Sequence, residues 1–381
     1  MKDLPLKNIW VLEFCQYLSG PCATLRLADL GARVIKIERP NKGEAGRKLA
    51  IENQWVGEDS LLFHTINRNK DSFAADLNDP KDREWVDKLI AKADVLIHNF
   101  RPGTMEKKGL DYASVKKLNR SIIYASISGY GEEGPWKNKP GQDLLIQSLS
   151  GLAYTTGNKQ DNPVPFGLGL GDYLCGNQAV QGILAALIRK KRTGQGAKLE
   201  LSLLESAVDF QFELFTTYFQ SKRVPIRSSV NNAHTLLSAP YGIYKTADGY
   251  LAVAMMPLQR LNRAIDCVAL AGFTEAEAFT KRDEIKCVLT HHFKTNTTAH
   301  WLERSQPHDL WMAPVMNWDQ LRSTQTYRQL QVEQHVALNG GKTLTTTRCP
   351  IRMDGTVVHA AKPAPAVGEQ TDVIKAELSR K

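Results

Sequence analysis

A run of glycines precedes a single aspartate near the middle of the chain. The segment GLGLGDYLCGN, residues 167–177, places Gly167, Gly169 and Gly171 at every second position before Asp172. An apolar run, AVQGILAALI, follows at once and has the character of a helix. Glycines let a second backbone or a flat ligand approach closely. The segment therefore raises the question of what the bare carboxylate of Asp172 does.

Asp172 has a structural and a chemical interpretation. As a helix N-cap, its side chain would accept backbone N–H bonds and gain from the helix dipole. As a nucleophile or base, it would be left uncovered so that a substrate carbonyl can reach it. Capping aspartates are far more common than catalytic ones, which favours the cap when this stretch is taken alone. Three glycines exceed what a cap requires, so both interpretations stay open.

The first two hundred residues alternate strands with helices. Short β-branched runs predict strands over residues 8–14, 33–38, 94–100 and 121–131. Helical patterns lie between them over residues 20–32, 80–93 and 111–119. This alternation predicts an α/β fold with a parallel, doubly wound sheet.

Polar side chains follow the predicted strands at their carboxyl ends, where such sheets bind their ligands. Arg39, Asn99, Phe100 and Tyr130 should therefore meet on one rim. A nicotinamide cofactor would normally show G-x-G-x-x-G after the first strand, and FCQYLSGP does not. Hydride transfer consequently loses support.

The pattern changes after about residue 205. One long amphipathic helix is expected over 205–220, and a hairpin over 242–256 around Asp248 and Gly249. Helices follow to about residue 330, which indicates a small α+β domain. The last fifty residues combine an extended segment with a final helix.

The composition excludes several classes of protein. Basic residues exceed acidic ones by 49 to 40, but the excess is dispersed, and no interleaving of aromatic and basic residues favours a nucleic-acid partner. Six cysteines lack a C-x-x-C pair or zinc-ligand spacing, so no metal site is expected. No apolar run approaches the ~18 residues of a membrane span, and the first residues lack a secretory pattern. We expect a cytoplasmic protein that binds neither nucleic acid nor membrane.

Motifs along nearly the whole chain carry a family resemblance. They include GPCATLRLADLGARVIKIERP, INRNKDS, ADVLIHNFRPGTMEKKGL, YASISGYGEEGP, LGDYLCG, NNAH, APYGIYKTADG and VGEQTD. Together they resemble the family III CoA-transferases of the CaiB/BaiF superfamily, the group that includes formyl-CoA transferase and carnitine CoA-transferase. Each motif is weak alone, and their order and spacing make the resemblance specific.

The resemblance implies that Asp172 is the nucleophile, because the aspartate of LGDYLCG has that role in the family. Its carboxylate would attack an acyl-CoA thioester, giving a mixed aspartyl anhydride and then an aspartyl-CoA thioester, which the incoming acid consumes. Backbone N–H groups at Gly167, Gly169 and Gly171 would stabilise the oxyanions. Acyl-CoA and a small carboxylic acid are then the substrates, with no tightly bound cofactor and no metal.

The resemblance also implies a set of CoA-binding residues. Arg39 matches a position near the adenosine phosphate, although a solvated loop charge is its plain alternative. Lys107 stands where many relatives carry arginine, and it keeps the charge but loses the bidentate fork. Ser128 replaces a lysine of formyl-CoA transferase, which argues against formate and oxalate. The full set is Leu18, Ser19, Arg39, Asn99, Phe100, Lys107 and Tyr130.

Domain organisation and assembly follow from the same resemblance. A Rossmann-like large domain is expected over 1–205, a linker helix over 206–225, a small α+β domain over 226–330, and a segment returning to the large domain over 331–381. Members of the family are interlaced homodimers, so a homodimer is expected here.

Two rival functions remain. An acyl-CoA racemase of the same superfamily needs two acid/base groups, and its relatives carry a G-H-D triplet where this chain has Gly141, Gln142 and Asp143. Glutamine cannot exchange a proton, although Asp143 or another residue could substitute. A non-catalytic CoA-binding protein would keep the rim and leave Asp172 paired away from the pocket. Cys22 and Cys175 lie near the expected site without a neighbouring histidine, and both are interpreted as structural.

Overall fold

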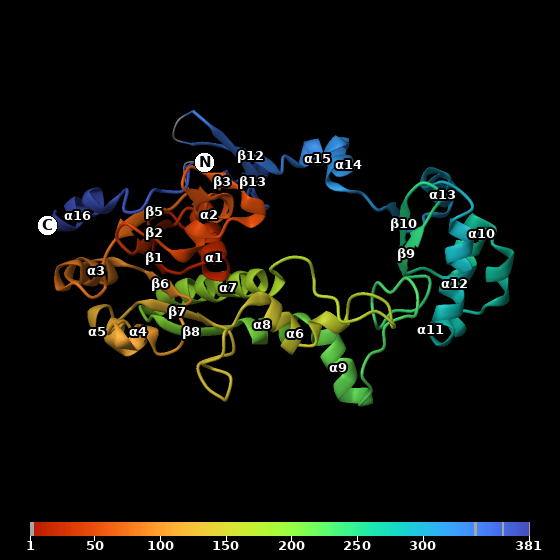
Figure 1. Ribbon diagram of the computed structural model, residues 1–381, viewed down its shortest axis with the longest axis horizontal. Coiled ribbons are helices and arrows are strands. Elements are labelled where there is room, and N and C mark those ends of the chain that lie inside the picture. Colours follow the sequence, from red (N-terminus) through yellow and green to blue (C-terminus); the bar gives the residue numbers. More distant parts are fainter. Residues whose placement is uncertain (1–3, 339–340, 360–361, 381) are drawn as a thin grey trace. The chain divides into compact units, whose positions relative to one another are not determined.

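The computed structural model describes residues 4–338, 341–359 and 362–380, and it divides into two compact units. The first unit contains Met1–Ile146, Gly169–Phe210 and Leu330–Lys381. The second contains Gln147–Leu168 and Gln211–Gln329. The C-terminal segment therefore belongs to the same unit as the N-terminal one (Figure 1).

A six-stranded parallel sheet forms the centre of the first unit, with the order β5-β2-β1-β6-β7-β8. The chain moves outward from β1 to β2 and then returns to add β6 on the other side of β1. This reversal makes the β1–β6 boundary the switch point of the sheet, where open α/β folds bind ligands. The strands are β1 (Trp10–Phe14), β2 (Arg33–Glu38), β5 (Asp71–Ala74), β6 (Val95–His98), β7 (Ile123–Ser128) and β8 (Ala197–Ser202).

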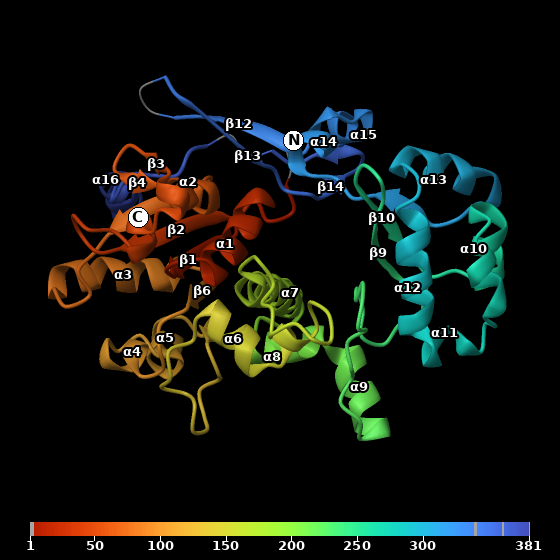
Figure 2. The ribbon, with the colours of Figure 1, turned by 45° about the vertical axis from the view of Figure 1, so that its right-hand side comes forward.

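Helices cover both faces of this sheet, as its apolar strands require. On one face, the helices α1 (Ser19–Asp29) and α7 (Leu170–Thr193) pack against each other and bury a core that includes Val11 and Ile183 (Figure 2). The other face carries α3 (Pro80–Lys92), α5 (Tyr112–Leu118) and α16 (Thr371–Ser379) over a second core. The predicted α/β fold with a parallel, doubly wound sheet is confirmed.

The remaining elements of the first unit are short. They are β3 (Trp55–Val56), β4 (Asp59–Ser60), α2 (Leu61–Asn67), α4 (Thr104–Lys107), α6 (Asp143–Leu149), which crosses the unit boundary, α8 (Leu203–Phe210), β12 (Glu333–Ala337), β13 (Thr343–Thr347), β14 (Arg352–Met353) and β15 (Thr356–Val357). None of the helices in the described residues combines the length and apolar character that crossing a membrane requires.

The second unit is a small α+β structure with its own core around Tyr244 and Trp301. Its antiparallel sheet has the order β11-β10-β9, and the predicted hairpin around Asp248 is present between β9 and β10. The elements are α9 (Phe212–Ser221), β9 (Gly242–Lys245), β10 (Tyr250–Val253), α10 (Leu258–Ile265), α11 (Glu277–Thr280), α12 (Arg282–Phe293), α13 (Thr298–Ser305), β11 (Met312–Pro314), α14 (Trp318–Ser323) and α15 (Gln325–Leu330).

Two expectations about elements need correction. The single helix expected over 205–220 is two helices, because the backbone leaves the helical conformation at Gln211, whose side chain donates to the carbonyl oxygen of Ser150 at 3.1 Å. Two strands of the sheet, β5 and β8, were not predicted. β5 is short and begins with the polar pair Asp71 and Ser72, and β8 alternates charged and apolar residues at the sheet edge.

A cluster of buried charges ties the carboxyl ends of β1 and β2 together. The ammonium of Lys36 lies 2.8 Å from Glu13, that of Lys70 lies 2.9 Å from the same carboxylate, and Glu44 lies 3.3 Å from Lys36. Thr24 donates to Glu13 at 2.7 Å. Burial opposes ionisation of Glu13, but the two lysines prevail and lower its pKa to about 2. Glu13 is therefore ionised at neutral pH, and its ion pairs join β1 to β2 and to Lys70, the residue before β5.

The close packing of α1 on α7 depends on Gly176. A Cβ at this position would lie 2.7 Å from the backbone oxygen of Ser19, whereas a Cβ at Gly182 of the same helix would meet Leu199 at an ordinary 3.5 Å. We predict that Gly176→Ala lowers the free energy of unfolding by about 1–3 kcal/mol, because backbone must move. The matched Gly182→Ala should be neutral or stabilising by up to about 1 kcal/mol. Urea denaturation checks this, and equal stability of the two variants would contradict the packing argument.

Candidate active site

Asp172 lies in the first turn of α7, on the third residue after the N-cap. The N-cap is Gly169, so the capping interpretation of Asp172 is wrong: its side chain does not occupy the capping position. The carboxylate of Asp143 takes that role, since its Oδ1 accepts the N–H of Gly171 at 2.6 Å and that of Asp172 at 3.2 Å. Asp172 is thus half-buried in the first turn of α7, and its carboxylate does not cap the helix.

The surroundings of Asp172 make its carboxylate unusually basic. Burial is the main cause, the nearby Asp143 adds to it, and a hydrogen bond from Ser19 opposes it, so that the pKa rises to about 6. Burial also raises the pKa of Cys22 to about 11 and that of Cys175 to about 12. Near pH 8 the carboxylate of Asp172 is therefore ionised, while both neighbouring thiols are protonated.

Two of the three glycines allow other elements to approach this helix start. A Cβ on Gly169 would lie 2.8 Å from the side chain of Leu18, and one on Gly171 would lie 3.1 Å from the Oδ1 of Asp143. The N–H of Gly171 is already bonded to Asp143. Gly167 belongs to the second unit, and a Cβ there would meet nothing within 4 Å. The two glycines of the first unit therefore shape the packing around Asp172.

Asn99 joins the two strands that flank the switch point. It follows β6, and its amide accepts the N–H of Gln16 at 2.8 Å and donates to the carbonyl of Gln16 at 2.7 Å. Tyr17, the residue after Gln16, has a φ of 62°, and its N–H donates to Glu44 at 3.0 Å. Because Leu18 and Ser19 follow directly, these bonds fix the loop before α1, where Ser19 hydrogen-bonds to Asp172. In this structure the Asn99 side chain is hydrogen-bonded to the backbone of Gln16.

Arg39 is exposed after β2 and lines a cavity of about 690 Å³. Lys42 lines the same cavity, and Arg47, also on its wall, is held by Glu38 and Asp59. Arg39 and Lys42 therefore give the opening a cationic edge suited to phosphate groups. Gln16 also lines it, which connects the cavity to the switch point.

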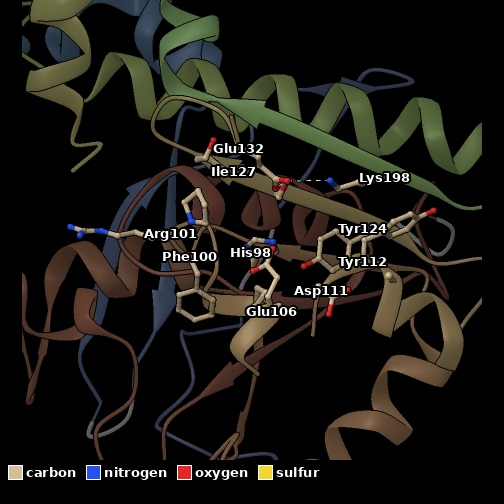
Figure 3. Close-up of a pocket in the computed structure, with 15 residues that line it drawn as sticks. His98, Phe100, Arg101, Glu106, Asp111, Tyr112, Tyr124, Ile127, Glu132 and Lys198 are labelled. Carbon is tan, nitrogen blue, oxygen red and sulfur yellow. Dashed lines mark hydrogen bonds and ion pairs between the residues drawn. The ribbon is translucent and has the colours of Figure 1, made fainter. Parts of the chain in front are cut away.

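Phe100 borders a second cavity, of about 280 Å³, between the ends of β6 and β7 (Figure 3). Its ring stacks on His98 with centroids 6.5 Å apart, and His98 meets Tyr124 edge-on at 5.3 Å. Burial lowers the pKa of His98 to about 4, so the ring is neutral at physiological pH. An ion pair of 3.1 Å between Lys198 and Glu132 forms another part of the wall (Figure 3). Asp172 does not line this cavity.

The other expected contacts are more dispersed. Tyr130 follows β7, and its hydroxyl donates to the carbonyl of Pro140 at 3.0 Å while its ring packs on Trp136. Lys107 ends the short helix α4 and is exposed. Ser128 accepts the N–H of Gly131 at 2.9 Å and so shapes the loop that carries Tyr130. Arg39, Asn99, Phe100 and Tyr130 all follow carboxyl ends of the sheet, but Arg39 and Phe100 border different cavities.

Comparison with known proteins places the chain in a family. The model of CoA-transferase family III matches residues 6–371, and the chain belongs to this family. It is 31% identical to the succinate–glutarate CoA-transferase of Agrobacterium fabrum, over 98% of this chain and 96% of that protein. It is 30% identical to the human succinyl-CoA:glutarate CoA-transferase, over 99% and 86% of the two chains.

A solved structure supports the same assignment. The crystal structure of a CaiB/BaiF family protein from Brucella suis superimposes with a TM-score of 0.84 at 28% identity, covering 99% of this chain and 100% of that one. The similarity therefore extends over both units and not over the parallel sheet alone.

Proposed function

We propose that this protein transfers CoA from an acyl-CoA donor to a free carboxylic acid through covalent intermediates on Asp172. The observation that carries the proposal is a half-buried carboxylate, released from capping, at the start of a helix in a chain of this family. Its neighbouring thiols are protonated near neutral pH, so the carboxylate is the group able to attack a thioester.

The exchange proceeds in four balanced steps. The Asp172 carboxylate attacks the thioester carbonyl, the carbon–sulfur bond breaks, and a mixed anhydride and CoA thiolate result. The thiolate attacks the aspartyl carbonyl and releases the donor acid, which leaves an aspartyl-CoA thioester. The acceptor carboxylate then attacks this thioester and expels the thiolate again. Attack of the thiolate on the acceptor's acyl carbon gives the new acyl-CoA and restores Asp172. No net proton is gained or lost.

The CoA contacts are part of the proposal. CoA would enter from the cavity of Arg39, pass the loop of Leu18 and Ser19 at the switch point, and reach Asp172 with its sulfur. The geometry that supports this path is the bond pair between Asn99 and Gln16, which holds the loop in place. Phe100, Lys107 and Tyr130 stay predicted contacts. A backbone oxyanion site is proposed at Gly169, and at Gly171 it requires the bond to Asp143 to open. The same role for Gly167 stays a prediction from the sequence.

The two relatives named above suggest which acids to try first. Both carry succinate or succinyl-CoA and glutarate in their names. We therefore propose a short dicarboxylic acid as the acceptor and an acyl-CoA of similar size as the donor. Incubation with succinyl-CoA and a panel of acids that includes glutarate, oxalate and formate, with the CoA esters identified by mass, tests the proposal. A panel without any new CoA ester would contradict it.

The racemase alternative finds less support in this site. Gln142 stands at the position of the histidine, and its carbonyl accepts the N–H groups of Leu145 and Ile146 at the start of α6. Asp143 accepts two backbone N–H groups at the start of α7, which is a structural role. A salt-bridged Asp172 would favour the non-catalytic alternative, and within the described part of the chain no cation is paired with it. Both observations favour transfer.

Arg39 provides a test of the nucleotide end of the proposed site. We predict that Arg39→Ala weakens CoA binding by about 1–3 kcal/mol, the range for losing a charge-assisted contact to phosphate. Calorimetry with CoA and dephospho-CoA should show that the variant no longer distinguishes the two ligands. Arg120→Ala is the control, because Arg120 is exposed before β7, at the opposite end of the strands. An equal loss for both ligands would mean that Arg39 does not contact the 3′-phosphate.

The homodimer also stays a proposal. Sedimentation at decreasing concentration tests it, and an active compact monomer would contradict it.

A further inference from the structure

The N-terminus of α7 is capped by a residue from another helix. Asp143 is the first residue of α6, and its Oδ1 accepts the N–H groups of Gly171 at 2.6 Å and Asp172 at 3.2 Å. These are two of the backbone donors that an α-helix leaves unsatisfied at its start. Since Gly169 at the N-cap has no side chain, the cap of α7 is a tertiary contact between elements 28 residues apart.

The contact has a steric condition at Gly171. A Cβ at this residue would lie 3.1 Å from the Oδ1 of Asp143 and 3.4 Å from a methyl carbon of Ile146. Few Cβ atoms approach an oxygen that closely, so a side chain would push the carboxylate away from the two N–H groups. The glycine before Asp172 is thus explained by Asp143, which must come close from the side of α6.

We propose that Asp143 is a positioning residue for the transfer reaction: it holds the first turn of α7, and with it the Asp172 carboxylate, in the place from which attack occurs. This inference rests on the proposed function for its catalytic consequence. Asp143 does not touch the reacting atoms in this account. It acts on the backbone of the nucleophile itself, which is the shortest connection through which a second residue can orient that side chain.

Asp143 has a second effect, through its charge. The ionisable groups that face Asp172 are Asp143 from α6, Cys22 from α1 and Cys175 from α7 itself, and Ser19 adds a hydrogen bond. Burial keeps both thiols protonated near neutral pH. Of these three groups, Asp143 is the one that carries a charge, and a like charge favours the protonated form of its neighbour. It therefore makes Asp172 more basic than burial alone would.

The two effects separate in the variant Asp143→Asn. Asparagine keeps an oxygen that can accept from the two N–H groups, but it removes the negative charge. We expect the midpoint of Asp172 protonation to move down by about one pH unit, from its wild-type value near 6. Asp143→Ala loses the acceptor as well as the charge. Its kcat should therefore be about tenfold to a hundredfold lower than that of Asp143→Asn, while KM for the acyl-CoA changes little.

The experiment reads the protonation of Asp172 without turnover. A water-soluble carbodiimide reacts with protonated carboxyl groups, and peptide mass spectrometry gives the extent of labelling at residue 172 between pH 4 and pH 8. The control is Asp79→Asn, because Asp79 is an exposed cap of α3 that accepts the N–H of Lys81 at 2.8 Å. The control midpoint should equal that of the wild type. Thermal denaturation of each variant accompanies the labelling.

The outcomes distinguish this inference from the proposed function. A kcat in Asp143→Ala that is lower than in Asp143→Asn, with KM for the acyl-CoA little changed, supports the positioning role, and a lower labelling midpoint in Asp143→Asn supports the effect of charge. A wild-type kcat in Asp143→Ala overturns the positioning role, and an unchanged or higher midpoint in Asp143→Asn overturns the effect of charge. Absence of CoA transfer by the wild-type protein would contradict the proposed function alone, because the labelling midpoint is measured without an acceptor acid.

Discussion

Replacing Asp172 by asparagine should abolish CoA transfer and at the same time make the folded protein more stable near pH 8. The first effect follows because an amide cannot form the anhydride or the aspartyl-CoA thioester. The second follows from the pKa of the carboxyl group, which burial and Asp143 raise to about 6 in the folded protein. Above pH 6 the folded protein carries the negative charge of Asp172 in a partly buried place beside Asp143, which is unfavourable. Asparagine removes this charge.

The stability that Asp172→Asn gains over the wild type depends on pH. A carboxyl group whose pKa is higher in the folded than in the unfolded state lowers stability above the folded pKa and has no such effect below the unfolded one. Asp172→Asn should gain up to roughly 3 kcal/mol over the wild type at pH 8, and the difference should vanish near pH 3, below the unfolded pKa of 3.8. Urea denaturation at the two pH values measures it. Retained transfer activity, or a loss of stability at pH 8, would contradict the assignment of a strained nucleophile.

Replacing Glu13 by glutamine should destabilise the first unit strongly. Glu13 is the shared partner of Lys36 and Lys70, and all three side chains are fully buried. Glutamine keeps the shape but removes the charge, which leaves two buried ammonium groups with Glu44 as the remaining carboxylate near Lys36. Breaking a buried pair in this way costs about 3–5 kcal/mol. The midpoint of urea denaturation should fall accordingly.

The change of stability at acid pH provides a second check on the buried cluster around Glu13. The pKa of Glu13 is lowered from its usual 4.5 to about 2, so its stabilisation is present above pH 4.5 and is lost as the pH falls toward 2. The difference between the wild type and Glu13→Gln should shrink over this range. Glu84→Gln is the control, because Glu84 pairs with Lys88 on the solvent-exposed face of α3. If Glu13→Gln proved as stable as that control, the cluster would contribute no net stability.

The parallel sheet was predictable where its strands are long and apolar. Residues 33–38 form β2 as expected, and β1, β6 and β7 lie inside the predicted ranges. β5 and β8 gave weaker signals. β8 alternates Lys198, Leu199 and Glu200 as an edge strand does, which is a period-two pattern that the sequence does contain. Only pairing with β7 distinguishes it from a loop after a long helix.

The sequence points to Asp172 as a candidate residue, but not to the cap that Asp143 provides for its helix. Gly171 and Asp172 stand next to each other in an unusual glycine pattern, so local sequence points to them. The cap from Asp143 connects two helices, and no spacing along the chain links such residues. The buried lysines were equally hidden, since Lys36 and Lys70 are of a type that is almost always exposed unless paired. Their partner Glu13 becomes apparent only when β1 and β2 lie side by side.

Trapping of the covalent intermediate tests the central claim most directly. Wild-type protein is mixed with succinyl-CoA in the absence of an acceptor acid, and hydroxylamine is added to capture an activated carboxyl group. We predict a hydroxamate at residue 172, identified by peptide mass spectrometry and absent in Asp172→Asn. Capture at Cys175 instead, or full turnover by Asp172→Ala, would contradict the account.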